Sequence, residues 1–153
     1  MDSTDRKILN LLQTDASLTV KQIAQQIALS VTPCWKRIQK LEQNGFIRAR
    51  VALLDPKKVN ASVTVFMAIK TDQHTSDWIE RFNREVSQLP EVMEIYRMSG
   101  EIDYLLRVVV SSIEAHDAFY KKLIDRIELA NVTSSFAMEQ IKYTTALPVS
   151  MDV

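Results

Sequence analysis

The side chains best suited to binding chemistry lie on a predicted helix from about Thr32 to Gln43. Three residues at helical spacing, Cys34, Ile38 and Leu41, form its buried face. The outward face carries cations, an amide and small polar groups, and its members are Thr32, Pro33, Trp35, Lys36, Arg37, Gln39 and Lys40. An α-helix fits the DNA major groove, where side chains reach base edges and Lys or Arg holds phosphates. This face therefore predicts contact with double-stranded DNA.

Two shorter helices are predicted before the basic helix. The first follows Ser3 or Thr4 as its N-cap and ends near Gln13, and the second follows Thr19 as its N-cap. A tight turn, residues 28–30, joins the second helix to the basic helix. Three short helices whose last two are joined by such a turn are typical of a helix-turn-helix.

Residues 46–53, directly after the basic helix, begin with alternating apolar and polar side chains. This alternation predicts strands that form a small wing beside the DNA backbone. The turn and the wing extend the predicted DNA-binding set by Ser30, Arg48 and Arg50. The alternative is a three-helix bundle with a solvated basic face. The single cysteine, Cys34, lies on the buried face, so we expect a small core residue rather than a redox sensor.

A break in the periodicity separates two predicted domains. Pro56 directs the residue before it away from helical geometry, so residues 54–61 are interpreted as a linker between domains 1–53 and 62–153. The apolar patterns that follow predict, in order, strand 63–70, a helix capped by Ser76, strands 92–99 and 103–110, a helix capped by Ser111 or Ser112, and strand 133–143. This βαββαβ order is that of the ferredoxin-like fold, which makes the chain α+β.

Both faces of the predicted sheet are apolar. In the first strand Val65 and Met67 oppose Phe66, and in the third strand Leu106 opposes Leu105. An antiparallel sheet with one face in water normally carries polar residues on that face. We therefore expect a homodimer that packs sheet against sheet and presents two DNA-reading helices.

The chain of 153 residues has a formal net charge of zero, but its charges are divided unevenly. Residues 1–60 contain ten Lys and Arg against five Asp and Glu, whereas residues 61–153 contain nine against fourteen. This asymmetry favours a basic module that meets phosphates and a second module with another partner. Apolar runs are too short for a membrane span, and the first residues lack a signal-peptide pattern. We expect a cytoplasmic protein without a membrane partner.

Four stretches together resemble the leucine-responsive / asparagine-operon regulator (Lrp/AsnC) family, over essentially the whole length. They are Asp5–Leu9, Thr32–Ile47, Leu54–Lys57 and Gly100–Tyr104. The resemblance implies a helix-turn-helix, a ferredoxin-like effector domain, and dimers that assemble into tetramers or octamers. It also implies control by a small molecule, usually an amino acid. Where the family commonly has glycine, this chain twice has asparagine, at Asn60 and Asn131.

By position, Gly100, Glu101 and Asp103 match the effector loop of that family. Gly100 permits a tight turn, Asp103 can accept a hydrogen bond from an α-ammonium group, and free backbone N–H groups can hold a carboxylate. The alternative for Asp103 is a structural turn carboxylate. Hydroxyls of a neighbouring dimer would add to the site. The full predicted effector set is Gly100, Glu101, Ile102, Asp103, Tyr104, Thr133, Ser134 and Ser135.

The sequence does not favour an enzyme. His74, His116 and Cys34 lack the spacing of metal ligands, and no nucleophile-elbow or phosphate-binding glycine motif is present. We expect no catalytic residue, no metal and no cofactor other than a small-molecule effector. Two alternatives remain open: a haem-biosynthetic decarboxylase of similar architecture, and a metabolite-sensing oligomer whose helix-turn-helix contacts only protein.

Overall fold

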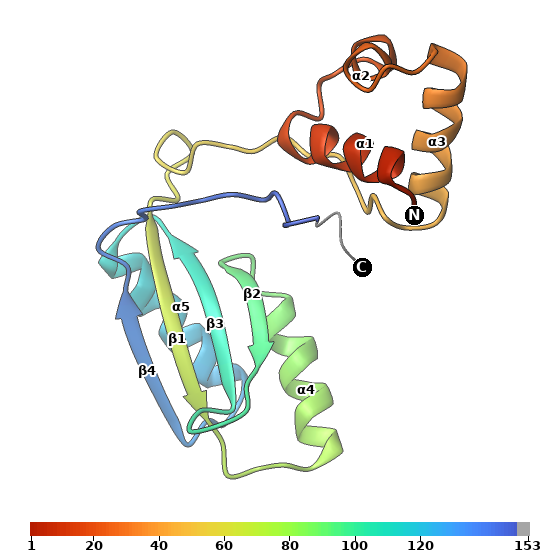
Figure 1. The fold of residues 1–153 in the computed structure, drawn as a ribbon. Coiled ribbons are helices and arrows are strands. Elements are labelled where there is room, and N and C mark those ends of the chain that lie inside the picture. Colours follow the sequence, from red (N-terminus) through yellow and green to blue (C-terminus); the bar gives the residue numbers. More distant parts are fainter. Residues whose placement is uncertain (150–153) are drawn as a thin grey trace. The chain divides into compact units, whose positions relative to one another are not determined.

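The computed structural model describes residues 1–149 (Figure 1). Reciprocal hydrogen bonds between side chain and backbone fix the start of its first two helices. Asp2, not Ser3 or Thr4, is the N-cap of the first helix: its side chain accepts a hydrogen bond from the Asp5 N–H, and the Asp5 carboxylate accepts one from the Asp2 N–H. Thr19, the predicted cap, and Gln22 form the same arrangement. Each reciprocal pair of hydrogen bonds, known as a capping box, satisfies N–H groups that have no partner inside the helix. The N-terminal helices are α1 (Ser3–Thr14), α2 (Val20–Gln26) and α3 (Val31–Gln43).

The turn between α2 and α3 contains one residue in the left-handed region, Ala28, with φ of 55°. The helix-turn-helix expectation is confirmed, but α3 begins earlier than predicted. Ser30, not Thr32, is its N-cap, and Pro33 takes the third helical position, where a backbone N–H would have no helical partner. Gly45, with φ of 74°, ends the helix in a left-handed conformation, which glycine adopts without steric cost.

The helices of this unit enclose a small apolar core. Cys34 is fully buried in it, and burial raises the pKa of its thiol, so its expected role as a core residue is confirmed. The buried residues are Ile8, Leu12, Ile23, Ala24, Cys34, Ile38 and Leu41.

The strands predicted for the wing are not found, because residues 46–53 form no strand within the chain. The N–H groups of Phe46 and Ile47 both donate to the Leu41 carbonyl, at the C-terminal end of α3. A strand needs a neighbour that accepts and donates its backbone hydrogen bonds. The described residues of the chain provide no such neighbour here.

A four-stranded antiparallel sheet with two helices forms the second unit (Figure 1). The strand order β2-β3-β1-β4, with crossovers through the two helices, is the ferredoxin-like arrangement that the sequence predicts. Thr75, not Ser76, is the N-cap of the first of these helices, and Ser112 is that of the second. The last strand ends at Phe136, before the predicted limit at residue 143. The elements are β1 (Val63–Lys70), α4 (Ser76–Ser87), β2 (Val92–Arg97), β3 (Tyr104–Val110), α5 (Ile113–Arg126) and β4 (Asn131–Phe136).

Contacts divide the chain into one unit of residues 54–140 and another that combines residues 1–53 with the C-terminal tail from residue 141. The chain thus passes from the first unit into the second and then returns. Asn60, in the connecting segment, has a φ of 57°, a conformation that asparagine tolerates better than most residues. The sequence-based limits of linker and second domain stay a prediction, and the sequence pattern did not indicate the return of the tail.

One sheet face is covered by α4 and α5 and forms the core of the second unit. Side chains of β3 alternate strictly between buried and half-buried, so every second residue faces the helices. The buried residues of this core are Val65, Met67, Ile69, Trp78, Phe82, Val86, Leu89, Tyr104, Leu106, Val108, Val110, Phe119, Leu123 and Ile127.

His116 is a buried histidine of α5 without a hydrogen bond partner at Nε2 within residues 1–149. The edge of Phe136 lies against its ring, with centroids 5.0 Å apart. Burial lowers the pKa of the imidazole, while Asp117 acts in the opposite direction.

We expect the second unit to lose stability in mild acid because of His116. Its pKa is lower in the folded than in the unfolded chain, where it is about 6.5, so its contribution is complete above that pH. As pH falls through about 6.5 the unfolded chain binds the proton first and stability decreases. Urea unfolding at pH values between 5 and 8 measures how steeply the free energy of unfolding changes with pH. His116→Phe should make this pH dependence shallower; the same pH dependence in the wild type and the variant would contradict the assignment.

No helix within residues 1–149 has the length and apolar character needed to cross a bilayer.

Candidate DNA-binding face and effector loop

The outward face of α3 is exposed and cationic. Lys36 and Lys40 are exposed one helical turn apart, and neither forms an ion pair within residues 1–149. Trp35 stands beside them with 47% of its surface exposed, as its distance from the buried stripe predicts. The N-terminal end of the face presents Ser30, Thr32 and Pro33, all exposed, while Gln39 is half-buried.

Arg37 does not belong to this free cationic face. Its guanidinium Nη1 lies 2.6 Å from an Asp2 carboxylate oxygen and 2.8 Å from one of Asp5, so it ties α3 to the start of α1. The Asp5 N–H, and then the Arg37 guanidinium, lower the pKa of Asp2. The prediction that Arg37 is available to phosphates is therefore corrected: the arginine is engaged within the unit.

The two arginines after α3 differ from each other. Arg50 donates to Glu42 at 2.9 Å, an ion pair in which both side chains are well exposed. Arg48 is exposed and forms no ion pair with any described residue. Exposed pairs contribute little to stability, so Arg50 can exchange Glu42 for another anion at small cost.

Asp103 organises the loop between β2 and β3. One of its carboxylate oxygens accepts the Thr71 N–H at 2.8 Å, and its own N–H donates to the Ile69 carbonyl at 2.9 Å. The Asp103 carbonyl accepts the Met98 N–H at 2.8 Å, which closes the loop. The side chain thus has the structural role that the sequence left open. Its second carboxylate oxygen has no hydrogen bond to the described residues.

The tip of this loop is open. Gly100 has a φ of 125°, and a Cβ at this position would meet no atom within 4 Å. Within residues 1–149, the backbone N–H groups of Gly100, Glu101 and Ile102 have no backbone acceptor. The structure therefore brings one carboxylate oxygen and several free donors into the same short segment.

Tyr104 corrects one predicted effector contact. Its side chain is 4% exposed and packs on Phe82, with ring centroids 4.3 Å apart, on the helix-covered face. Its position as the first residue of β3 explains this, because alternate strand residues face opposite sides.

The three hydroxyl residues of β4 do not share a face. Thr133 pairs with Ala68 and Ser135 with Phe66 on the open face, whereas Ser134 pairs with buried Met67 on the helix side. Two strands, β1 and β3, separate β4 from the strand β2 that leads into the effector loop. Within one chain these hydroxyls and the loop therefore do not form a single site.

Known families match both parts of the chain. The family described as "Winged helix-turn-helix DNA-binding" matches residues 1–48, and "Lrp/AsnC ligand binding domain" matches residues 64–147. The chain belongs to the Lrp/AsnC family. It is accordingly a DNA-binding transcription regulator with a ligand-binding domain, and members of this family are not enzymes. The decarboxylase alternative is thereby set aside.

Similar Lrp/AsnC proteins cover nearly the same length. The DNA-binding transcriptional activator DecR of Escherichia coli (strain K12) is 49% identical over 97% of this chain and 99% of that protein. The crystal structure of an AsnC family transcriptional regulator from Agrobacterium tumefaciens has a TM-score of 0.95 and 61% identity, covering 97% of both chains. A Neisseria meningitidis transcriptional regulator in complex with L-methionine has a TM-score of 0.92 and 35% identity, covering 97% of this chain and 96% of that one.

Two residues of these Lrp/AsnC sites were not found by sequence reasoning. Thr71 holds the Asp103 carboxylate through its backbone, a contact for which residue type gives no signal. Asp2 pairs with Arg37 across 35 residues of sequence; a carboxylate opposite a helix arginine is only recognisable once α1 and α3 are packed.

Proposed function

We propose that this regulator recognises specific DNA sequences with the exposed face of α3. The observation that carries the proposal is that Lys36 and Lys40 lie free beside exposed Trp35, on the second helix of a helix-turn-helix. Recognition helices place N-terminal side chains against base edges and hold phosphates with their cations. The similar regulators named above come from bacteria, whose DNA lies in the cytoplasm, so we place the protein there. The proposed contacts are Ser30, Thr32, Pro33, Trp35, Lys36, Gln39, Lys40 and Arg48, with Arg50 exchanging Glu42 for a phosphate.

The proposed effector is an α-amino acid bound at residues 100–103. The free carboxylate oxygen of Asp103 suits an α-ammonium group, and the unpaired N–H groups of the loop suit an α-carboxylate. The backbone at Gly100 is open to a ligand, and its φ of 125° is a conformation that residues with a side chain rarely adopt. The L-methionine held by the Neisseria meningitidis regulator supports this ligand class. Thr133 and Ser135 would contribute only from another subunit.

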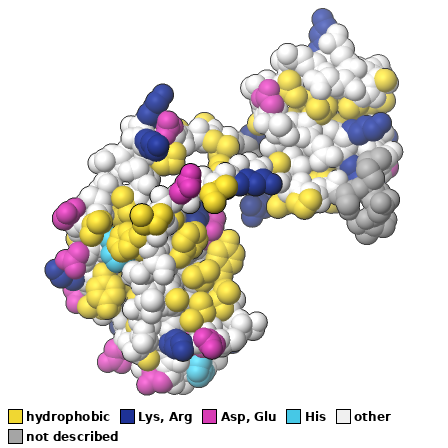
Figure 2. Space-filling view, turned by 60° about the vertical axis from the view of Figure 1, so that its left-hand side comes forward, with side chains coloured by type: hydrophobic (Ala, Val, Ile, Leu, Met, Phe, Trp, Pro, Cys, Tyr) yellow, Lys and Arg dark blue, Asp and Glu magenta, His cyan; other side chains and the backbone are white. Residues whose placement is uncertain are grey.

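We propose a homodimer that buries the open face of the sheet, with larger assemblies built from it. Phe66 and Tyr96 are 40% and 51% exposed, and Leu105 lies half-buried between their strands. The charged pair on this face, Arg107 and Glu94, is internally neutralised at 3.0 Å and can be buried as a unit. Figure 2 shows hydrophobic side chains gathered on the surface of the second unit.

Leu105→Glu should dissociate the dimer. Arg107, on the same face, already pairs with Glu94, so a carboxylate at position 105 would bring an uncompensated charge into the interface, and we expect dimerisation at least about 100-fold weaker. Sedimentation at micromolar concentration measures this, with Ile124→Glu on exposed α5 as the matched control. A folded wild-type monomer at that concentration would contradict the proposed interface.

A thermal-shift screen of the twenty amino acids, followed by a DNA titration with each hit, tests the proposed function. We expect at least one amino acid to raise the melting temperature, because a ligand that binds only the native state stabilises it. The same amino acid should change DNA affinity. An amino-acid shift together with no DNA binding would instead support the metabolite-sensing oligomer.

A further inference from the structure

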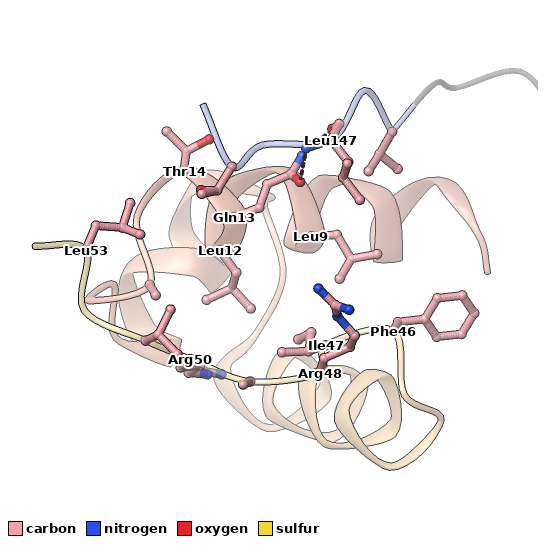
Figure 3. Close-up of a pocket in the computed structure, with 15 residues that line it drawn as sticks. Leu9, Leu12, Gln13, Thr14, Phe46, Ile47, Arg48, Arg50, Leu53 and Leu147 are labelled. Atoms are coloured by element: carbon pink, nitrogen blue, oxygen red, sulfur yellow. Dashed lines mark hydrogen bonds between the residues drawn. The ribbon is translucent and has the colours of Figure 1, made fainter. Parts of the chain in front are cut away.

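The chain after β4 returns to the first unit, and one glutamine of α1 binds its backbone. The Gln13 Nε2 donates to the Leu147 carbonyl at 2.8 Å, and the Leu147 N–H donates to Gln13 Oε1 at 2.9 Å (Figure 3). A third bond, from Gln13 Nε2 to Asn10 Oδ1 at 3.0 Å, fixes the orientation of the amide. The amide thus pairs with both polar groups of one backbone residue, as a residue of a neighbouring antiparallel strand does.

Local turns shape the segment around Leu147. The Ala146 N–H donates to the Thr144 hydroxyl at 3.1 Å, and the Val149 N–H donates to the Leu147 carbonyl at 2.9 Å. Pro148, between them, has no N–H that needs a partner. Residues 144–149, here called the C-terminal strap, therefore have an ordered backbone on both sides of the glutamine contact.

The strap also forms one wall of a cavity of about 430 Å³ in the first unit. Leu9 and Leu12 of α1 and Ile47 line the same cavity, so the strap lies over an apolar part of the unit (Figure 3). The Leu147 side chain itself remains 73% exposed. Attachment at this residue therefore depends on its backbone, through Gln13, more than on its side chain.

We propose that the C-terminal strap transmits the effector-dependent state of the second unit to the recognition helix, an inference that rests on the proposed function. The chain leads from β4 of the sheet through residues 137–143 to the strap, and the strap binds α1 at Gln13. The other end of α1 holds α3 through the Arg37 ion pairs. Coupling between distant sites requires an element with two states, and here these are the docked and the released strap.

Two substitutions at one position separate the backbone contact from the side chain. Leu147→Pro removes the N–H that Gln13 accepts, whereas Leu147→Ala keeps it and alters only an exposed side chain. Gln13→Ala removes the same contact from the α1 side. In the full chain, hydrogen exchange of residues 141–149 should be about tenfold faster in Leu147→Pro and Gln13→Ala, and unchanged in Leu147→Ala. Equal exchange rates in the wild type and all three variants would overturn the claim that Gln13 holds the strap through the Leu147 backbone.

The transmitting role is tested by DNA affinity with and without an equimolar mixture of the twenty amino acids. The mixture should change the DNA affinity of the wild type and of Leu147→Ala. It should change the DNA affinity of Leu147→Pro and Gln13→Ala less than about twofold. Without the mixture, all of these proteins should bind DNA with the wild-type affinity. A full response in the latter two would overturn the proposal. A wild type that binds DNA but ignores the mixture would overturn the effector hypothesis and with it the transmitting role, while hydrogen exchange would still report on strap docking.

Discussion

Replacing Lys36 and Lys40 together with alanine will weaken DNA binding at least about 100-fold at 0.1 M salt. Both lysines are exposed on α3 and unpaired within the described chain, so neither contributes to the fold through an ion pair. Each phosphate contact releases condensed counterions and adds about 0.9 to the slope of log affinity against log salt. A dimer loses four contacts, so the slope should decrease by about 3.6. Alanine retains the helix because it is the best helix former.

Fluorescence anisotropy over a range of salt concentrations measures both effects. The control is Lys121→Ala with Lys122→Ala, which removes the same charge from α5, where the two lysines pair with Asp117 and Glu91. An unchanged salt slope in the α3 variant, or an equal loss in the control, would exclude α3 as the phosphate-binding face.

Asp103→Asn should weaken amino-acid binding about tenfold to 100-fold and leave DNA binding without effector intact. The amide oxygen still accepts the Thr71 N–H, so the loop keeps its shape while the charge that faces the ammonium group is lost. A hydrogen bond to a charged group contributes about 1.5–3 kcal/mol, which sets this range. Asp103→Ala is a less informative change, because it also removes the acceptor for Thr71.

Calorimetry with the amino acid identified by thermal shift measures the affinity of the Asp103 variant. Asp72→Asn, in an exposed neighbouring position, removes the same charge and serves as the control. Undiminished affinity in Asp103→Asn would show that the carboxylate is structural only and that the effector binds elsewhere.

Much of the fold follows from local patterns in the sequence. The stripe of Cys34, Ile38 and Leu41 determines which face of α3 is buried, and it also leaves Trp35 outside. Alternation along β3 likewise assigns each residue to one of the two sheet faces. Such periodicities depend only on helical and strand geometry, which is why they can be recognised without tertiary contacts.

Features that depend on distant partners could not be predicted in this way. Arg37 looks like its neighbour Lys36 in the sequence, and only the packing of α1 brings Asp2 and Asp5 to it, across 35 and 32 residues. One carboxylate oxygen of Asp103 likewise accepts the backbone N–H of Thr71, which lies 32 residues earlier in the sequence.

The end of the sheet shows the same limit. Residues 137–143 follow Phe136 with a β-compatible sequence but form no strand. Further along the chain, Leu147 instead binds Gln13, which lies 134 residues earlier. A strand forms only where a neighbour satisfies its backbone, which local propensity does not reveal.

Selection from a random pool of double-stranded DNA by the wild-type protein at low ionic strength tests the central claim most directly. Two α3 helices of a twofold dimer should enrich a pseudo-palindromic sequence with half-sites about 34 Å, or one helical turn, apart or a multiple of it. A protein that retains no DNA of any sequence under these conditions would contradict the account.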